Sequence, residues 1–123
     1  APSSASRSNV EEMSLVVIED VMSSGPGGRI WDAAVVLGSW ILEHYGKKGM
    51  NDMAVIELGA GIGLVGMVCA KLGAEVSVTD KESLLPLIGA NIRHNAEEQV
   101  ERGLLWAERL EWGQKLTKRM KRR

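Results

Sequence analysis

Residues 57–66 read ELGAGIGLVG, a glycine-rich bend between two apolar segments. Residues 54–58 are typical of a short buried strand, and residues 64–72 are typical of a helix that ends at Gly73. The three alternating glycines let the backbone turn sharply and let a ligand approach closely, because no Cβ stands in the way. The start of the helix presents free N–H groups and a partial positive charge to that ligand. The pattern predicts a ligand site where the strand turns into its helix.

Strand-like and helix-like segments alternate downstream of the bend. Residues 75–79 contain the β-branched side chains that favour a strand, and residues 104–110 alternate in the way of a third strand. Between them, Ser83 is placed to cap a helix that runs to about Asn95, with Pro86 in its first turn. This order is that of a βαβαβ unit, half of a doubly wound parallel sheet. We therefore predict an α/β protein whose site lies at the carboxyl ends of its strands.

Three further elements are predicted upstream of the bend. Residues 15–18 (LVVI) indicate a short strand, and residues 23–28 (SSGPGG) indicate the loop that ends it. Apolar residues at helical spacing predict a helix over 31–45, with Gly46 where a helix is expected to stop.

The composition of the chain is that of one soluble domain. Its 123 residues carry 15 Lys and Arg against 16 Asp and Glu, so the chain as a whole is no polyelectrolyte for nucleic acid or a membrane surface. Its longest uncharged stretch, residues 58–70, is too short to span a bilayer. The chain has a single cysteine, Cys69, which excludes an internal disulfide framework. Its only histidines are His44 and His94, so it has too few soft ligands for a zinc cluster and we predict no metal site. We expect a reduced, cytoplasmic protein.

The two ends of the chain differ in composition and charge from the predicted ligand-binding domain, residues 13–113. Residues 1–12 lack periodicity and begin rich in serine, so we expect a disordered lead. Residues 114–123 hold six of the fifteen cations, which leaves nine against sixteen acids, a net charge of −7, in residues 1–114. This basic tail is interpreted as a solvated terminus or, alternatively, as a nuclear-import or nucleic-acid patch. It has no interleaved aromatic residues for base stacking, which argues against RNA recognition.

The second predicted strand ends in an acid that indicates the class of ligand. Asp80 follows the first glycine of the bend at the spacing typical of an acid that accepts both hydroxyls of a ribose. We therefore expect a ligand that contains an adenosine. Residues 61–66 (GIGLVG) also match the dinucleotide fingerprint G-x-G-x-x-G, and Asp80 occupies the place of its acid, so NAD is one candidate.

Two features favour a different adenosine ligand. In the NAD pattern the first glycine follows the strand almost directly, whereas Gly59 and Ala60 intervene here. Glu57 also puts a carboxylate beside the bend, where it is unhelpful to a pyrophosphate but suits the ammonium group of an amino acid. S-adenosylmethionine has a nucleoside at one end and an amino acid at the other, and it is the predicted cofactor.

Four blocks of the sequence, in the same order, resemble the methyltransferase-like 21 group: residues 28–37 (GRIWDAAVVL), 57–66 (ELGAGIGLVG), 76–80 (VSVTD) and 110–113 (LEWG). The predicted helix at 86–91 continues the match between the last two. The resemblance covers about residues 13–114, with Ile62 in place of a threonine. The group consists of S-adenosylmethionine-dependent protein-lysine methyltransferases with a seven-strand, Rossmann-like class I fold. Known members methylate chaperones of the Hsp70 type and the valosin-containing AAA ATPase. The resemblance thus implies a lysine-containing protein substrate of that kind, with no membrane partner.

The resemblance implies cofactor contacts at Trp31, Gly59, Ala60, Gly61, Asp80 and Trp112. Asp80 would hold the ribose, Trp112 would pack on the adenine, and Trp31 would close the methionine side. Glu57, beside the bend, completes the candidate site. Simpler roles stay open for four of these residues. The two tryptophans are alternatively core aromatics, Asp80 a helix cap, and Glu57 an acceptor for neighbouring backbone N–H groups.

The substrate-facing part of the family pattern does not follow Gly113. In the family it comes after a fourth strand, with an Asp and a Tyr shortly after a Gly-Ala pair, so no catalytic residue is assigned here. We expect a Rossmann-like fold truncated after about its third strand, with the strand at 54–58 as an exposed edge. The expected function is protein-lysine methylation, with this chain an inactive amino-terminal fragment in the cytoplasm and also the nucleus. The alternatives are a non-catalytic adenosyl-ligand or protein-binding fragment, and an NAD-binding oxidoreductase half-domain.

Overall fold

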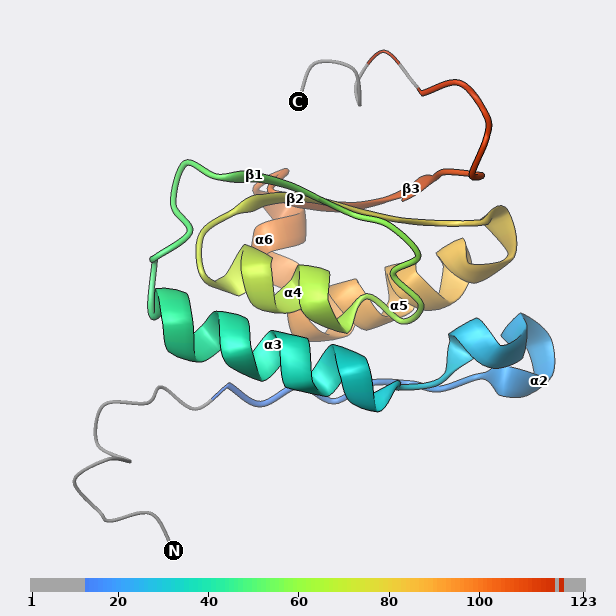
Figure 1. The fold of residues 1–123 in the computed structure, drawn as a ribbon, viewed down its shortest axis with the longest axis horizontal. Coiled ribbons are helices and arrows are strands. Elements are labelled where there is room, and N and C mark those ends of the chain that lie inside the picture. Colours follow the sequence, from blue (N-terminus) through green and yellow to red (C-terminus); the bar gives the residue numbers. More distant parts are fainter. Residues whose placement is uncertain (1–12, 117, 119–123) are drawn as a thin grey trace, which may run out of the picture.

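The computed structural model describes residues 13–116 and residue 118, which contain a three-stranded parallel sheet (Figure 1). The strands lie in the order β1-β2-β3 and are β1 (Ala54–Glu57), β2 (Glu75–Asp80) and β3 (Leu105–Arg109). The predicted α/β fold with three parallel strands is confirmed. The predicted lead at 1–12 and most of the basic tail at 114–123 lie outside the described residues.

The helices form layers on one face of the sheet. α4 (Leu64–Lys71) and α5 (Leu85–Asn95) connect the strands and pack on the same face, as right-handed crossovers between neighbouring parallel strands require. α3 (Asp32–Tyr45) packs on α4, and the short α6 (Glu97–Glu101) leads into β3 (Figure 1). α3 and α4 both begin at the end of the molecule where β1 and β2 finish (Figure 1). None of the helices in the described part of the chain has the length and apolar character needed to cross a membrane.

The core lies between the sheet and its two connecting helices. Its fully buried apolar side chains include Met67, Leu72, Val76, Val78, Ile88 and Leu105. Gly66 lets α4 approach β2 closely, because a Cβ on Gly66 would collide with the Val78 side chain. This approach brings the start of α4 to the carboxyl ends of β1 and β2.

Two of the predicted helices are confirmed with small changes at their ends. The helix expected at 31–45 is α3, which begins one residue later and stops at Gly46. The helix expected at 64–72 is α4, and Gly73 follows it with a φ of +107°.

The segment at 15–18 is not the predicted strand. It has no strand partner and runs beside α5, where its backbone pairs with side chains of that helix. The LVVI composition favours an extended chain but does not specify what the chain pairs with. The loop expected at 23–28 is also different, since it contains the end of a short helix, α2 (Val21–Ser24), and a 3-10 turn, η1 (Gly25–Gly28).

The connection from β2 into α5 begins differently from the prediction. A 3-10 turn, η2 (Glu82–Leu84), contains Ser83, and α5 begins only at Leu85 with Pro86 in its first turn. The prediction that Ser83 caps this helix is wrong, because the extra turn moves the start of α5 beyond it. α6 has no counterpart among the predicted elements, because its five residues are too few to show a helical period.

β1 is an edge strand among the described residues, as expected for 54–58. It pairs with β2 alone, and the side chains of Ile56 and Leu58 are exposed. A hollow of about 470 Å³, lined mainly by apolar side chains, lies between these residues and Trp112. The backbone groups on the outer side of β1 are therefore open to pairing with a further strand.

Candidate functional site

The turn from β1 into α4 is a glycine bend, residues 58–63, that lies against another loop. Gly61 has a φ of +63°, a left-handed conformation that residues with a Cβ disfavour. A Cβ on Gly61 would also stand 3.1 Å from the carbonyl oxygen of Gly27 in η1. Both the backbone conformation and the available space therefore require glycine at 61. The contact with Gly27 is not predicted from the sequence, because the run GPGG indicates only a turn.

Asp80 ends β2 with its carboxylate directed at the bend. Its Oδ2 accepts a hydrogen bond from the Gly61 N–H at 2.9 Å, and its Oδ1 accepts one from the Lys81 N–H at 2.7 Å. Lys81 begins the segment that leads into α5, whereas Gly61 belongs to the bend, so Asp80 holds the bend in addition to its bond at the start of that segment. A carboxylate has about four lone-pair sites, so both oxygens can still accept hydrogen bonds from ligand hydroxyls.

Thr79 fastens the bend to β2, a role that the sequence does not indicate. Its hydroxyl donates a hydrogen bond to the carbonyl oxygen of Glu57 at 2.6 Å, and its own carbonyl accepts the Ala60 N–H at 2.9 Å. The side chain of Thr79 is fully buried, so these bonds are shielded from water. The predicted site residues Ala60, Gly61 and Asp80 are thus brought together through the end of β2.

Glu57, the last residue of β1, lies beside the start of α4. Its Oε1 accepts a hydrogen bond from the N–H of Gly66, the third residue of that helix, at 3.0 Å. The carboxyl group therefore satisfies one of the unpaired N–H groups at a helix start, as its simpler role requires. Burial raises the pKa of Glu57 to about 7, the Gly66 N–H opposes this rise, and the charge of Asp80 adds to it. A ligand cation beside Glu57 would favour the ionised carboxylate.

The two predicted tryptophans are on the surface, so neither is a core aromatic. Trp112 is 79% exposed, and its Cζ2 lies 3.5 Å from the position that a Cβ on Gly59 would take. An exposed indole therefore stands beside the bend. Trp31 is 50% exposed at the start of α3, with the Arg29 guanidinium 5.1 Å from its ring centroid. The start of α3, which Trp31 caps, is at the same end of the molecule as the start of α4 (Figure 1).

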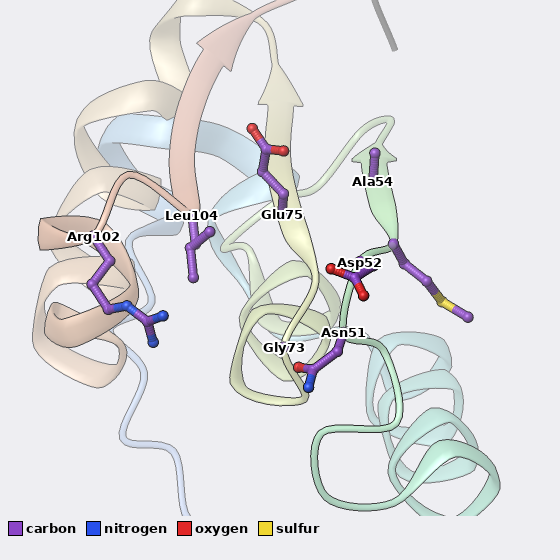
Figure 2. A pocket seen from close by; sticks show the side chains of 8 residues that line it. Asn51, Asp52, Ala54, Gly73, Glu75, Arg102 and Leu104 are labelled. Atoms are coloured by element: carbon purple, nitrogen blue, oxygen red, sulfur yellow. The ribbon is translucent and has the colours of Figure 1, made fainter.

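A separate hollow lies at the opposite end of the sheet (Figure 2). It has a volume of about 520 Å³, with Arg102 on one side and Asp52 on the other. Glu75, at the first position of β2, also lines it. Open parallel α/β sheets bind their ligands at the carboxyl ends of the strands, whereas this hollow is at the amino ends. The candidate site is therefore the group of residues around the glycine bend.

The residues around the bend fit a ligand that joins an adenosine to an amino acid. The remaining lone pairs of Asp80 suit ribose hydroxyls, and the exposed indole of Trp112 suits the face of a purine. The carboxyl group of Glu57 suits a cationic end of the ligand. Together the parallel sheet, the glycine bend and the acid on the second strand are the features of a Rossmann-like domain, a fold whose ligands lie at this end of the sheet.

The chain belongs to the lysine methyltransferase family. The family model with this description matches residues 9–123, which is nearly the whole chain. The resemblance drawn from the four sequence blocks is thereby confirmed at the level of the family. Membership of a methyltransferase family implies S-adenosylmethionine as the methyl donor.

Curated relatives carry names that agree with this family. The chain is 41% identical over 98 residues to the protein N-lysine methyltransferase METTL21A of Danio rerio, an alignment that covers 80% of this chain and 44% of that protein. It is 37% identical over 118 residues to the protein-lysine N-methyltransferase EFM6 of Saccharomyces cerevisiae, covering 84% of this chain and 46% of the relative. It is 38% identical over 87 residues to the protein-lysine methyltransferase METTL21E of Mus musculus, an alignment that covers 71% of this chain and 35% of that protein. The chain therefore spans less than half the length of each of these relatives.

Proposed function

We propose that this chain binds S-adenosylmethionine at the glycine bend and supplies the cofactor-binding part of a protein-lysine N-methyltransferase. The observation that carries the proposal is the hydrogen bond from the Gly61 N–H to the Asp80 carboxylate. It holds an acid from one strand against the glycine turn of the neighbouring strand, which is the arrangement that receives the ribose of an adenosine ligand. Family membership supports the choice of a sulfonium methyl donor over other adenosine ligands.

Each residue of the site has a separate role in this proposal. Asp80 accepts hydrogen bonds from the ribose hydroxyls, and the backbone from Gly59 to Gly61 passes beside the methionine moiety. Trp112 packs on the adenine, which its exposed indole beside Gly59 supports. Glu57 faces the ammonium group with the carboxyl oxygen that Gly66 does not engage. Trp31 closes the methionine side from the start of α3.

In this methyl transfer the main contribution of the protein is to align the cofactor with the incoming lysine. When bound, the cofactor supplies a methyl group that its sulfonium already activates. The chain's own residues hold the adenosyl and amino-acid ends, so that a deprotonated lysine can approach the methyl group in line with the bond that breaks. The incoming lysine belongs to a protein, and the sequence resemblance supports a chaperone of the Hsp70 type or an AAA ATPase.

We propose further that these 123 residues alone bind the cofactor but transfer little methyl. The length of the relatives supports this, because the chain spans less than half of each named relative. The proposed location is the cytoplasm, with access to the nucleus, which the free buried Cys69 and the basic tail favour.

NAD binding is the second candidate, because GIGLVG followed by Asp80 has the dinucleotide spacing. Calorimetric titration of the chain with S-adenosylhomocysteine and, separately, with NAD distinguishes the two. We expect binding of S-adenosylhomocysteine and none of NAD. Binding of NAD without S-adenosylhomocysteine would reverse the assignment. Transfer of labelled methyl to a purified Hsp70-type chaperone, expected to be slight, tests whether the chain acts alone.

A further inference from the structure

Two asparagine side chains of α5 pair with the chain that precedes α2. Asn95 accepts the Val16 N–H through Oδ1 at 2.6 Å and donates through Nδ2 to the Val16 carbonyl at 2.8 Å. Asn91 does the same for Ile18, with distances of 2.6 and 3.0 Å. Each asparagine thus engages both backbone groups of one residue. We call residues 13–20 the strap.

The spacing of the two asparagines matches the spacing of the strap. Residues four apart on a helix are separated by about 6 Å along its axis. Alternate residues of an extended chain are separated by about 6.6 Å. Asn91 and Asn95 therefore act like one edge of a sheet toward Val16 and Ile18. Asn91 is fully buried, so its amide depends on these bonds and would be costly to leave unpaired.

Apolar packing involves only one side of the strap. Along the strap, Leu15 and Val17 are half-buried against the core, whereas Val16 is 66% and Ile18 49% exposed. A hollow of about 270 Å³ remains between the inward side chains of the strap and those of α3 and α4. Met13 packs on the core in the same way as Leu15 and Val17, and the asparagines add the hydrogen bonds that join the strap to α5.

The strap leads directly to the turn that touches the glycine bend. The Ile30 N–H donates to the Glu19 carboxylate at 2.9 Å, and the Asp20 N–H donates to the Gly28 carbonyl at 2.7 Å. These bonds close residues 19–30 into one loop, which contains η1. Gly27 is next to Gly28, where the loop closes; its carbonyl lies against Gly61 and its Cα faces the Leu84 side chain. The closed loop therefore connects the strap with the bend.

We propose that Asn91 and Asn95 are positioning residues that hold η1 over the glycine bend. With the asparagine bonds made, the Gly27 carbonyl covers Gly61 and keeps the bend in the conformation in which its N–H faces Asp80. With the bonds broken, the loop leaves and the bend is exposed to water. The identity of the ligand in this scheme rests on the proposed function, whereas the coupling between strap and bend does not.

The first experiment needs no ligand. Amide hydrogen exchange is measured on the whole chain and on Asn95→Ala, with Arg93→Ala, an exposed neighbour on α5, as the matched control. Asn95→Ala should speed exchange about tenfold or more at Val16 and at Gly61, because it removes both hydrogen bonds to Val16 and a third to the Asn91 carbonyl. Exchange at Val76 in the core should stay as it is, and Arg93→Ala should change none of these amides.

A second variant approaches the same bond from the strap. Val16→Pro removes the N–H that Asn95 accepts and leaves α5 intact, so it should also speed exchange at Gly61. Faster exchange in the strap with Gly61 unchanged in both variants would overturn the proposal. An equal increase at Val76 in both variants would also overturn it, because the asparagines would then only support global stability.

The second experiment uses S-adenosylhomocysteine as the probe. Coupling is reciprocal, so the bound probe should slow exchange at Val16 and Ile18, which it does not touch. Asn95→Ala should raise the Kd about fivefold or more, and Arg93→Ala should leave it unchanged. Unchanged exchange in the strap on binding would overturn the proposal. If no variant binds the probe, the proposed function fails, while the ligand-free comparison still decides whether the strap and the bend are coupled.

Discussion

The Asp80 carboxylate and the Gly61 N–H are 2.9 Å apart, so the end of β2 and the bend after β1 form one structural unit. Thr79 strengthens this unit, because it bonds to the carbonyl of Glu57 and to the N–H of Ala60, at either end of the pair 58–59. The backbone that is proposed to meet the ligand is thus held in place by β2 without a ligand. Such preorganisation reduces the ordering cost of binding.

Asp80→Ala should weaken binding of S-adenosylhomocysteine by about 1–3 kcal/mol, because it removes the acceptor for the ribose and for Gly61. Isothermal titration calorimetry measures the loss. Glu82→Ala, at an exposed position two residues along the chain, is the control and should bind normally. An unchanged affinity in Asp80→Ala would remove this residue from the site.

Glu57→Gln should change how stability depends on pH. The pKa of Glu57 is about 7 in the folded chain, against an ordinary value of 4.5, so the folded state holds this proton more tightly. The contribution of Glu57 to the free energy of unfolding is therefore greatest below pH 4.5. It falls as the pH rises from 4.5 to 7 and stays constant above pH 7. The loss amounts to about 3 kcal/mol.

Gln keeps the acceptor for the Gly66 N–H but does not titrate, so Glu57→Gln should remove most of this decline and be the more stable protein at pH 8. Urea unfolding at several pH values measures it. Glu101→Gln, exposed in α6, is the control and should follow the unaltered chain. Equal slopes for Glu57→Gln and the unaltered chain would contradict the assigned burial of this carboxyl group.

Gly61→Ala should destabilise the chain by about 1–3 kcal/mol, because alanine is strained at a φ of +63° and its Cβ would crowd the Gly27 carbonyl. Gly89→Ala is a matched control that should change the free energy of unfolding in the opposite direction. Gly89 is in α5, a Cβ there meets no atom within 4 Å, and alanine should add about 0.5–1 kcal/mol. Chemical denaturation compares the two, and a neutral result at 61 would contradict the described bend.

Trp112→Ala should weaken binding of S-adenosylhomocysteine by about 1 kcal/mol or more, through loss of stacking on the adenine. It should change the free energy of unfolding by less than about 0.5 kcal/mol, since the side chain is 79% exposed. Trp40→Ala is the control for binding, because Trp40 is also an exposed indole but lies on α3. Equal affinities for the two variants would place the adenine elsewhere.

Local sequence patterns predict most of the fold because the elements that form the βαβαβ unit carry their own signals. The apolar strand at 54–58, the alternating glycines and the acid that ends the second strand all depend on short-range spacing. The same signals predict that Asp80 and the bend meet, since parallel neighbouring strands end at one edge of the sheet. Exposure of the 54–58 edge follows from the resemblance to a larger sheet.

The features that the sequence does not reveal depend on partners far along the chain. Residues 15–18 favour an extended backbone, but only the three-dimensional structure shows that their partners are Asn91 and Asn95. The raised pKa of Glu57 comes from burial under α4, which no local pattern reports. The contact of Gly27 with Gly61 joins two turns that α3 and β1 separate along the chain. Ser83 is a residue type that often caps helices, but an additional 3-10 turn contains it and α5 begins after that turn.

The unpaired side of β1 makes cofactor affinity depend on more than the residues that touch the cofactor. Among the described residues this strand is paired on one side only, and an edge strand is expected to fluctuate more than a strand paired on both sides, here next to the place where the methionine moiety is proposed to lie. Any polypeptide that completes the sheet at β1 would damp those fluctuations and tighten binding without a single new contact to the ligand. The affinity of this chain by itself would then be a lower bound for the completed sheet.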